Sequence, residues 1–284
     1  MRRLKYFRLG LLACVVLVGA ATAQAQQFGD SKPIGKEGPA VAKAICAVKS
    51  LLVAGQTCKV AADSLGTSLL YGQGQAQKEY VLEHFIAGSF TQKGANQALV
   101  GMCQAAGKIC SGEIVLLERS GSGWRAVRAY TNAPFDFYLG ACYKFPGADG
   151  RDRLVCRSEG YLDTQGLEYL FNLTAAEFSS KLTTTRLLSY GLASICSDKT
   201  QRVVQASTWA RKDLNRDRRA DLELVLSESP KAKVVCNPTT SLAKYEPGQT
   251  TPVRLAFIFD GKAFKPTAQT TAKIKTLPAP KIPR

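Results

Sequence analysis

Oxygen-bearing side chains recur at alternate positions in one short stretch of the chain. Asp213, Asn215, Asp217 and Asp221 occupy positions 1, 3, 5 and 9 of a nine-residue loop, and Arg219 offers a backbone carbonyl at position 7. Calcium takes six to eight hard oxygen ligands, and alternate residues of a tight loop can direct several of them inward. The spacing therefore predicts a Ca²⁺ site, and Ca²⁺ is the only cofactor that the sequence suggests.

The same loop has a second interpretation that needs no metal. It departs from a full EF-hand, because Leu224 stands at position 12 instead of glutamate and Arg218 stands at position 6 instead of glycine. Basic side chains also surround the acids, and they could pair with the carboxylates and oppose a divalent ion. The alternative is a surface turn closed by ion pairs to one of these residues: Arg211, Lys212, Arg216, Arg218 and Arg219.

Few side chains in the sequence suggest catalysis. The single histidine, His84, lies in an apolar strand-like pattern, which favours a half-buried, hydrogen-bonded residue over a catalyst. One histidine also excludes zinc sites built from several histidines. Two acidic pairs, Asp149 with Asp152 and Glu159 with Asp163, have the residue types that glycosidases use. We therefore take a non-catalytic binding or scaffold protein as the main hypothesis and a carboxylate-dependent hydrolase of an envelope polymer as the alternative.

Nine cysteines are present, and one of them, Cys14, lies in the apolar run near the N-terminus. The other eight are Cys46, Cys58, Cys103, Cys110, Cys142, Cys156, Cys196 and Cys236. An even number in an exported chain predicts disulfides. Sequence neighbours close short loops at little cost, so we expect the pairs 46–58, 103–110 and 142–156, which leaves 196–236. Zinc is disfavoured, because the gap between Cys103 and Cys110 is longer than that of a zinc knuckle.

Residues 1–25 have the layout of a signal peptide. A basic start is followed by an uncharged run from Leu9 to Ala21 and by small residues up to Ala25. The run is shorter than the span of about 20 residues that crosses a bilayer. We expect cleavage after Ala23 or Ala25, with a lipoprotein modified at Cys14 as the alternative. The sequence thus predicts export to the periplasm or the exterior, without a transmembrane anchor.

The chain is strongly basic, with a formal net charge of +16. Such an excess can draw a protein to anionic polymers of the cell envelope, although it also serves solubility. The basic residues are scattered, without the dense clusters of a nucleic-acid-binding arm. We therefore expect no specific nucleic-acid partner, and an anionic envelope polymer or a protein remains as the candidate partner.

Most of the remaining sequence predicts a mainly β fold of antiparallel sheets. Short apolar or β-branched runs predict strands at residues 80–85, 113–117, 124–130, 201–206, 222–226 and 253–259. Residues 120–123 and the pair Asp260-Gly261 predict hairpin turns. Helical spacing after Pro39 predicts a short helix that would end near Gly55, with a hairpin as the alternative. A capping-box pattern from Thr174 to Glu177 predicts a second short helix at 175–183.

The segment from Trp209 to Leu226 resembles one FG-GAP or VCBS repeat, the unit of integrin-like β-propellers. In that family an Asp-x-Asp-x-Asp-Gly-x-x-Asp loop joins two strands of a blade and can hold calcium. Residues 87–100 and 143–155 resemble degenerate copies, because each has a phenylalanine nine residues before a leucine and a glycine between them. The resemblance implies sheets of propeller-blade type in an incomplete or irregular propeller, because a full ring has more repeats.

These observations predict four regions in the chain. They are a signal peptide at 1–25, a flexible lead-in at 26–38, a disulfide-stabilised β-rich repeat domain at 39–276, and an extended Pro-rich tail at 277–284. A domain of this length can bury a full hydrophobic core. The disulfides would therefore stiffen a fold that already has a core.

Overall fold

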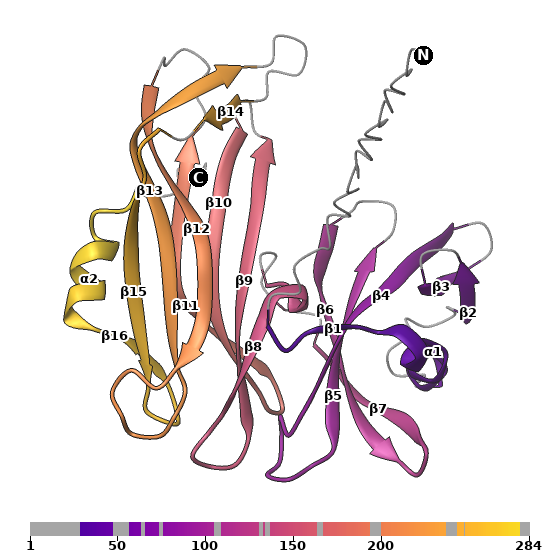
Figure 1. The fold of residues 1–284 in the computed structure, drawn as a ribbon. Helices are drawn as coiled ribbons and strands as arrows, with labels where there is room; N and C mark the ends of the chain where they lie inside the picture. The colour runs from indigo at the N-terminus through magenta and orange to yellow at the C-terminus, as the bar shows by residue number, and fades with distance from the viewer. Residues whose placement is uncertain are drawn as a thin grey trace, which may run out of the picture.

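The computed structural model describes residues 29–47, 57–63, 66–73, 76–104, 109–130, 133, 137–163, 167–193, 200–236, 243–246 and 248–278. The expected signal peptide lies outside these residues. Within them, the strands form three antiparallel sheets, which we call the first, middle and last sheets in chain order (Figure 1). The mainly β, antiparallel architecture expected from the sequence is confirmed.

The first sheet follows a simple meander in which sequence neighbours pair. Its strands are β2 (Thr57–Asp63), β3 (Gly66–Gln73), β4 (Ala76–Gly88), β5 (Gln97–Gln104), β6 (Ile109–Ser120) and β7 (Gly123–Tyr130). The short strand β1 (Lys32–Pro33) pairs with β4 beyond the end of β3. The expected hairpin is confirmed, because Ser120 faces Gly123 across a two-residue turn.

The middle and last sheets repeat this up-and-down order. The middle sheet contains β8 (Cys142–Pro146), β9 (Asp152–Asp163), β10 (Leu167–Phe178) and β11 (Leu182–Ala193). The last sheet contains β12 (Thr200–Lys212), β13 (Asp221–Cys236), β15 (Thr251–Phe259) and β16 (Phe264–Pro266), and β14 (Ala243–Glu246) pairs with β13. The six strands that the sequence predicted fall within strands of the first and last sheets, and the predicted Asp260-Gly261 turn joins β15 to β16.

The three sheets stack face to face around buried apolar side chains. One cluster joins the first and middle sheets and includes Ile86, Leu99, Leu154 and Phe178. A second cluster, with eighteen buried members, joins the middle and last sheets through residues such as Phe171. The middle sheet is therefore buried on both faces, which explains its long apolar strands.

Two short α-helices cover the outer parts of the stack, on opposite sides of the molecule (Figure 1). Helix α1 (Gly38–Cys46) packs Val41 and Ile45 onto the outer face of the first sheet. Helix α2 (Ala268–Ile274) covers an edge of β15, because the Thr267 amide donates to the Ala256 carbonyl and Ala256 N–H donates to Thr270 Oγ1. No helix among the described residues is long and apolar enough to span a membrane. Two 3₁₀ turns, η1 (Gly35–Glu37) and η4 (Leu139–Ala141), precede α1 and β8.

Two local expectations are corrected by the structure. The capping-box pattern at Thr174–Glu177 lies in strand β10, and the predicted helix at 175–183 is the β10–β11 hairpin. Side chains of β10 are buried alternately on the two faces of the middle sheet, and this burial outweighs a local helix signal. The predicted N-terminal helix does form, but α1 ends at Cys46, and residues 48–56 lie outside the described part of the chain.

The lead-in expected to be flexible is packed over residues 29–38. Gly29 forms a parallel bridge to Cys142 with φ of 107°, and a Cβ at this position would lie 2.0 Å from the Cys142 carbonyl oxygen. Only glycine permits this approach. Asp30 N–H then donates to the same carbonyl at 2.7 Å, and Ile34 is buried against α1 and the first sheet. At the other end, the Pro278 carbonyl accepts from Gly191 N–H, and the rest of the expected tail lies outside the described residues.

One expected disulfide is confirmed. Cys142 and Cys156 face each other on neighbouring strands β8 and β9 and are bonded. Cys46 and Cys103 are also disulfide-bonded, to partners outside the described side chains. The pairings 46–58, 103–110 and 196–236 stay predictions. A disulfide is compatible with an exported protein.

Candidate functional site

Each of the three segments that resemble FG-GAP repeats joins two neighbouring strands of one sheet. Residues 89–96 join β4 to β5, residues 147–151 join β8 to β9, and residues 213–220 join β12 to β13. With the β15–β16 turn at 260–263, they lie at the same end of the stack (Figure 1). We call this surface the loop end.

Hydrogen bonds between loops make the loop end continuous. Ser89 N–H donates to Asp152 Oδ2 at 2.8 Å, and Asp152 N–H donates back to the Ser89 carbonyl at 2.8 Å. Ala148 N–H donates to the Gly261 carbonyl at 2.8 Å, and Arg219 Nη1 donates to the Asp260 carbonyl at 2.7 Å. These contacts tie all three sheets together at one end.

The strands that lead into the three loops, β4, β8 and β12, are also joined directly. Lys144 Nζ on β8 donates to the Ala87 carbonyl on β4 at 2.9 Å, and Arg211 Nη1 on β12 donates to the Lys144 carbonyl at 2.9 Å. Asp30 links β8 to β12, because its carboxylate accepts from Lys144 N–H and from both Nη atoms of Arg211. Sequence reasoning missed Asp30, since a single acid in a polar segment carries no local signal of a partner far along the chain.

A buried polar residue begins the strand that follows each of the three loops. These residues are Gln97 on β5, Asp152 on β9 and Asp221 on β13, with exposed fractions of 2%, 8% and 0%. Each one accepts backbone N–H groups at the loop end: Gln97 from Phe90 and Thr91, Asp152 from Ser89, and Asp221 from Leu214 and Phe259. The sequence flagged Asp152 and Asp221 for other roles and missed Gln97. The residues that follow these three share no simple pattern, since Asp152 is followed by Arg153 and Asp221 by Leu222 and Glu223, so their common role is visible only in the fold.

The acidic loop satisfies its own backbone. Asp213 accepts from the N–H groups of Asp217 and Arg218 at 3.1 and 3.0 Å, and Asn215 also accepts from Asp217 N–H. Asp217 in turn accepts from Arg219 N–H at 2.8 Å. The side chains at positions 1, 3 and 5 thus curl the loop in the way that the alternate spacing suggested.

The loop does not gather its carboxylates around one point. Both oxygens of Asp221, at position 9, accept from backbone N–H groups inside the protein. Among the described residues, no group of three Asp, Glu, His or Cys side chains is placed to hold a metal ion. In this arrangement the loop is a hydrogen-bonded turn whose donor set does not fit a bound cation, and calcium binding stays a prediction from the resemblance.

Two arginines of this loop adopt a backbone conformation that side chains rarely take. Arg216 and Arg218 have φ values of 64° and 68°, in the left-handed region that favours glycine. Both side chains are exposed, and neither has an ion-pair partner within the described residues. The ion pairs that the sequence suggested between these arginines and the loop acids therefore do not form.

A second charged cluster lies beside the β8–β9 loop. The Asp149 carboxylate accepts from both Nη atoms of Arg153 at 2.9 Å and from Arg151 Nε at 2.7 Å. Glu177 Oε1 accepts from Arg151 Nη2 at 2.7 Å and lies 3.3 Å from Arg153 Nη2. Hydrogen bonding to the Arg153 guanidinium holds the pKa of Asp149 well below its usual range. Asp149 is thus a poor general acid, since that role needs a raised pKa.

Asp152 and Glu159, two of the other acidic residues suggested for catalysis, have backbone or basic partners. Asp152 bonds to Ser89 and lies 3.7 Å from Lys144 Nζ. Glu159 pairs with Arg157 on its own strand, and the side chain of Asp163 lies outside the described residues.

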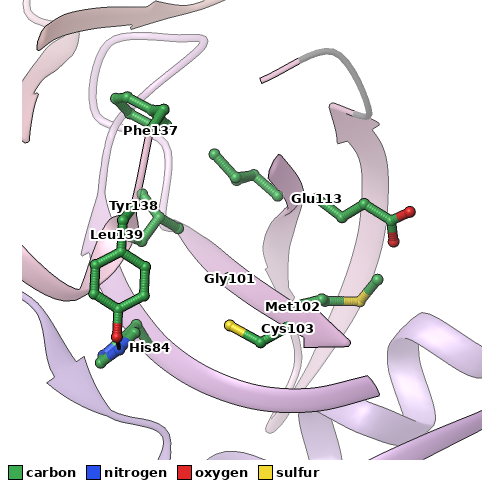
Figure 2. Close-up of a pocket in the computed structure, with 9 residues that line it drawn as sticks. His84, Gly101, Met102, Cys103, Glu113, Phe137, Tyr138 and Leu139 are labelled. Carbon is green, nitrogen blue, oxygen red and sulfur yellow. Dashed lines mark hydrogen bonds between the residues drawn. The ribbon is translucent and has the colours of Figure 1, made fainter. Parts of the chain in front are cut away.

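His84 is half-buried on β4 and hydrogen-bonded, as its sequence context indicated. Its Nε2 contacts the Tyr138 hydroxyl, which also lies 3.3 Å from Glu83 Oε2. The hydrogen bond to His84 lowers the pKa of Glu83, and burial raises the pKa of Tyr138. Figure 2 shows Tyr138 reaching toward His84 while Glu113 points away from them. The cavity beside them measures about 10 Å³, room for about one water molecule.

Comparison with protein-family models, with curated proteins and with solved structures found no match. The fold and the site therefore define this protein only as a mainly β, disulfide-bonded protein of three stacked antiparallel sheets.

Proposed function

We propose that this protein is an exported, non-catalytic binding protein built from FG-GAP-like β repeats, and that its loop end binds an anionic polymer of the cell envelope. One observation carries the proposal. Arg216 and Arg218 are held out from the loop end at positive φ, exposed and without ion-pair partners in the described part of the chain.

The backbone cost of these two residues supports a role in binding. A residue other than glycine in the left-handed region costs roughly 1 kcal/mol. Strain of this kind is often kept at functional sites, where the surrounding structure holds it in place. Here the side chains of Asp213 and Asn215 hold the strained turn by accepting its N–H groups.

The placement of the repeat-like segments supports the FG-GAP-like part of the proposal. Each segment spans the junction of two neighbouring strands of one sheet, as the corresponding loop of that family joins two strands of a blade. The cross-linked loops give a preorganised surface, so little conformational entropy is lost on binding.

The charge of the chain supports an anionic partner. Lys93 and Lys262 are also exposed at the loop end and lack ion-pair partners among the described residues. The expected signal peptide and the disulfides agree with export to a compartment that contains anionic envelope polymers.

Binding to an immobilised polyuronate such as polygalacturonate tests the proposal. We expect binding that weakens as salt is added, because screening acts on exposed charges. The double variant Arg216→Ala/Arg218→Ala should bind about 2- to 10-fold more weakly, as the loss of two exposed ion pairs suggests. The matched control, Lys273→Ala/Lys275→Ala, removes the same charge from the α2 region and should bind like the unchanged protein. No binding at low salt, or an equal loss in the control, would overturn the proposal.

A further inference from the structure

A groove opens at the loop end where the middle and last sheets separate. Its volume is about 100 Å³. One wall is the β10–β11 pair of the middle sheet, and the other is the β15–β16 turn of the last sheet. The lining residues are Arg153, Ala175, Ala176, Glu177, Thr183, Thr185, Leu187, Lys262, Ala263 and Phe264.

The register of β10 and β11 explains which side chains form the wall that this strand pair contributes to the groove. Glu177 faces Thr183 and Ala175 faces Thr185 across the β10–β11 pair, so these four side chains lie on one face of the sheet. Leu187 continues this face toward the core between the sheets. The groove therefore has an apolar base that continues into the core and polar groups at its mouth.

Only one of the two carboxylate oxygens of Glu177 has a partner among the described residues. Its Oε1 atom interacts with Arg151 and Arg153, whereas Oε2 has no hydrogen-bond partner among the described residues. Arg153 is 5% exposed and is itself fixed by Asp149, so the carboxylate of Glu177 has a rigid support. Such support is what positions a binding group accurately.

The remaining polar groups of the groove are also free to bind. The hydroxyls of Thr183 and Thr185 and the ammonium of Lys262 have no partner within the described residues. Together with Glu177 they offer one acceptor, two groups that both donate and accept, and one cation. Lys262 lies on the opposite wall from Glu177, so a ligand must place its negative charge toward one wall and its donors toward the other.

We propose that the groove binds one acidic sugar residue of the hexuronate class, as a unit of the anionic polymer held by the loop end; this inference rests on the proposed function. The sugar carboxylate pairs with Lys262, its hydroxyls bond to Glu177 Oε2 and to the two threonines, and its C–H face packs on Leu187 and Phe264. The small volume suits a single unit of a longer chain, since whole-ligand pockets measure about 300–1,000 Å³.

Calorimetric titration with a galacturonate tetramer tests the groove. The same tetramer with its carboxyls reduced to alcohols keeps the sugar rings but lacks the negative charge. A glutamate tetrapeptide keeps the negative charge but lacks the sugar rings. We expect the galacturonate tetramer to bind at least 5-fold more tightly than either comparison ligand. Lys262→Gln should remove the preference for galacturonate over the reduced tetramer, and Lys273→Gln should keep it.

The threonines provide the matched test of sugar recognition. Thr183→Val/Thr185→Val should weaken both tetramers severalfold, whereas Thr184→Val, on the opposite face of the same strand, should weaken neither. Unfolding midpoints show whether each variant is folded. Glu177→Gln is a further variant of the groove, because its amide oxygen can still accept the hydrogen bond from Arg151. The groove proposal would be overturned if the glutamate tetrapeptide bound as tightly as the galacturonate tetramer. It would also be overturned if Thr184→Val weakened binding as much as Thr183→Val/Thr185→Val.

The outcomes separate this inference from the proposed function. If polygalacturonate binding depends on Arg216 and Arg218 but not on the groove residues, the groove proposal fails and the proposed function stands. If neither the polymer nor the tetramer binds, both fail.

Discussion

The loops at residues 89–96 and 213–220 both join neighbouring strands at the loop end but are closed by different residues. The first uses Gly94 at φ of 69°, where a Cβ would meet nothing within 4 Å, and one buried amide, Gln97. The second uses Arg216 and Arg218 at similar φ values and the carboxylate of Asp221. Both loops solve the same problem, which is to turn the chain and give its N–H groups an acceptor.

The difference between the two loops separates folding from function. Glycine and glutamine suffice for the first turn, so the arginines of residues 213–220 exceed what a turn at this place requires. Arginine in place of glycine at positive φ strains the backbone of the second loop, whereas Gly94 avoids this strain in the first loop. This contrast favours the loop of the last sheet as the part of the loop end that carries binding.

The largest expected effect is on the buried acceptors. Asp221→Ala removes a fully buried carboxylate and leaves the N–H groups of Leu214 and Phe259 without their acceptor, and we expect a loss of about 3 kcal/mol in unfolding free energy. Gln97→Ala removes a neutral acceptor and should cost less, about 2 kcal/mol. Urea denaturation measures both. A larger loss of unfolding free energy for Gln97→Ala than for Asp221→Ala would contradict the expected order of the two acceptors.

Exchanging the residues at positive φ should change stability in opposite directions. Arg216→Gly relieves strain and should stabilise by about 0.5–1 kcal/mol, while Gly94→Ala introduces strain and should destabilise by a similar amount. Arg216→Gly should also weaken polyuronate binding, so that stability and binding change in opposite senses. The same denaturation curves and binding assay apply. A destabilised Arg216→Gly would show that the arginine supports the fold.

A smaller effect is expected from acid. Because the pKa of Asp149 is lowered in the folded protein, its contribution is present above the unfolded pKa of about 3.9 and is lost as pH falls toward the folded pKa. The side chain is 40% exposed, so the contribution should stay below about 1 kcal/mol. Unfolding free energies at pH 6 and at about pH 3 should therefore differ less in Asp149→Asn than in the unchanged protein. An identical difference would exclude this contribution.

Calcium should have the smallest effect. A weak site with Kd of about 1 mM would stabilise by only about 0.4 kcal/mol at an equal concentration of the ion. The carboxylates already accept the loop's own N–H groups, so we expect a melting-temperature rise of about 2 °C or less at 1 mM calcium. A larger rise that Asp217→Ala abolishes would establish the calcium site that the loop spacing predicts.

Local patterns in the sequence accounted for much of the fold. Apolar alternation located strands such as 253–259, and glycine turns located the hairpins at 120–123 and 260–263. The short separation of Cys142 and Cys156 predicted their bond. These features depend on neighbouring residues, and the preferences of turns and strands act over such distances.

Only the tertiary structure decided which residues meet. It made Thr174–Glu177 a strand, because the sheets on either side bury both faces of β10. It placed Asp30 between Lys144 and Arg211, and it brought Glu177 and Lys262 to opposite walls of one groove. The sequence by itself determined six of the strands and two of the hairpin turns, through local backbone preference and burial pattern. The sites arise from contacts between sheets, whose partners lie far apart along the chain and leave no periodic signal in it.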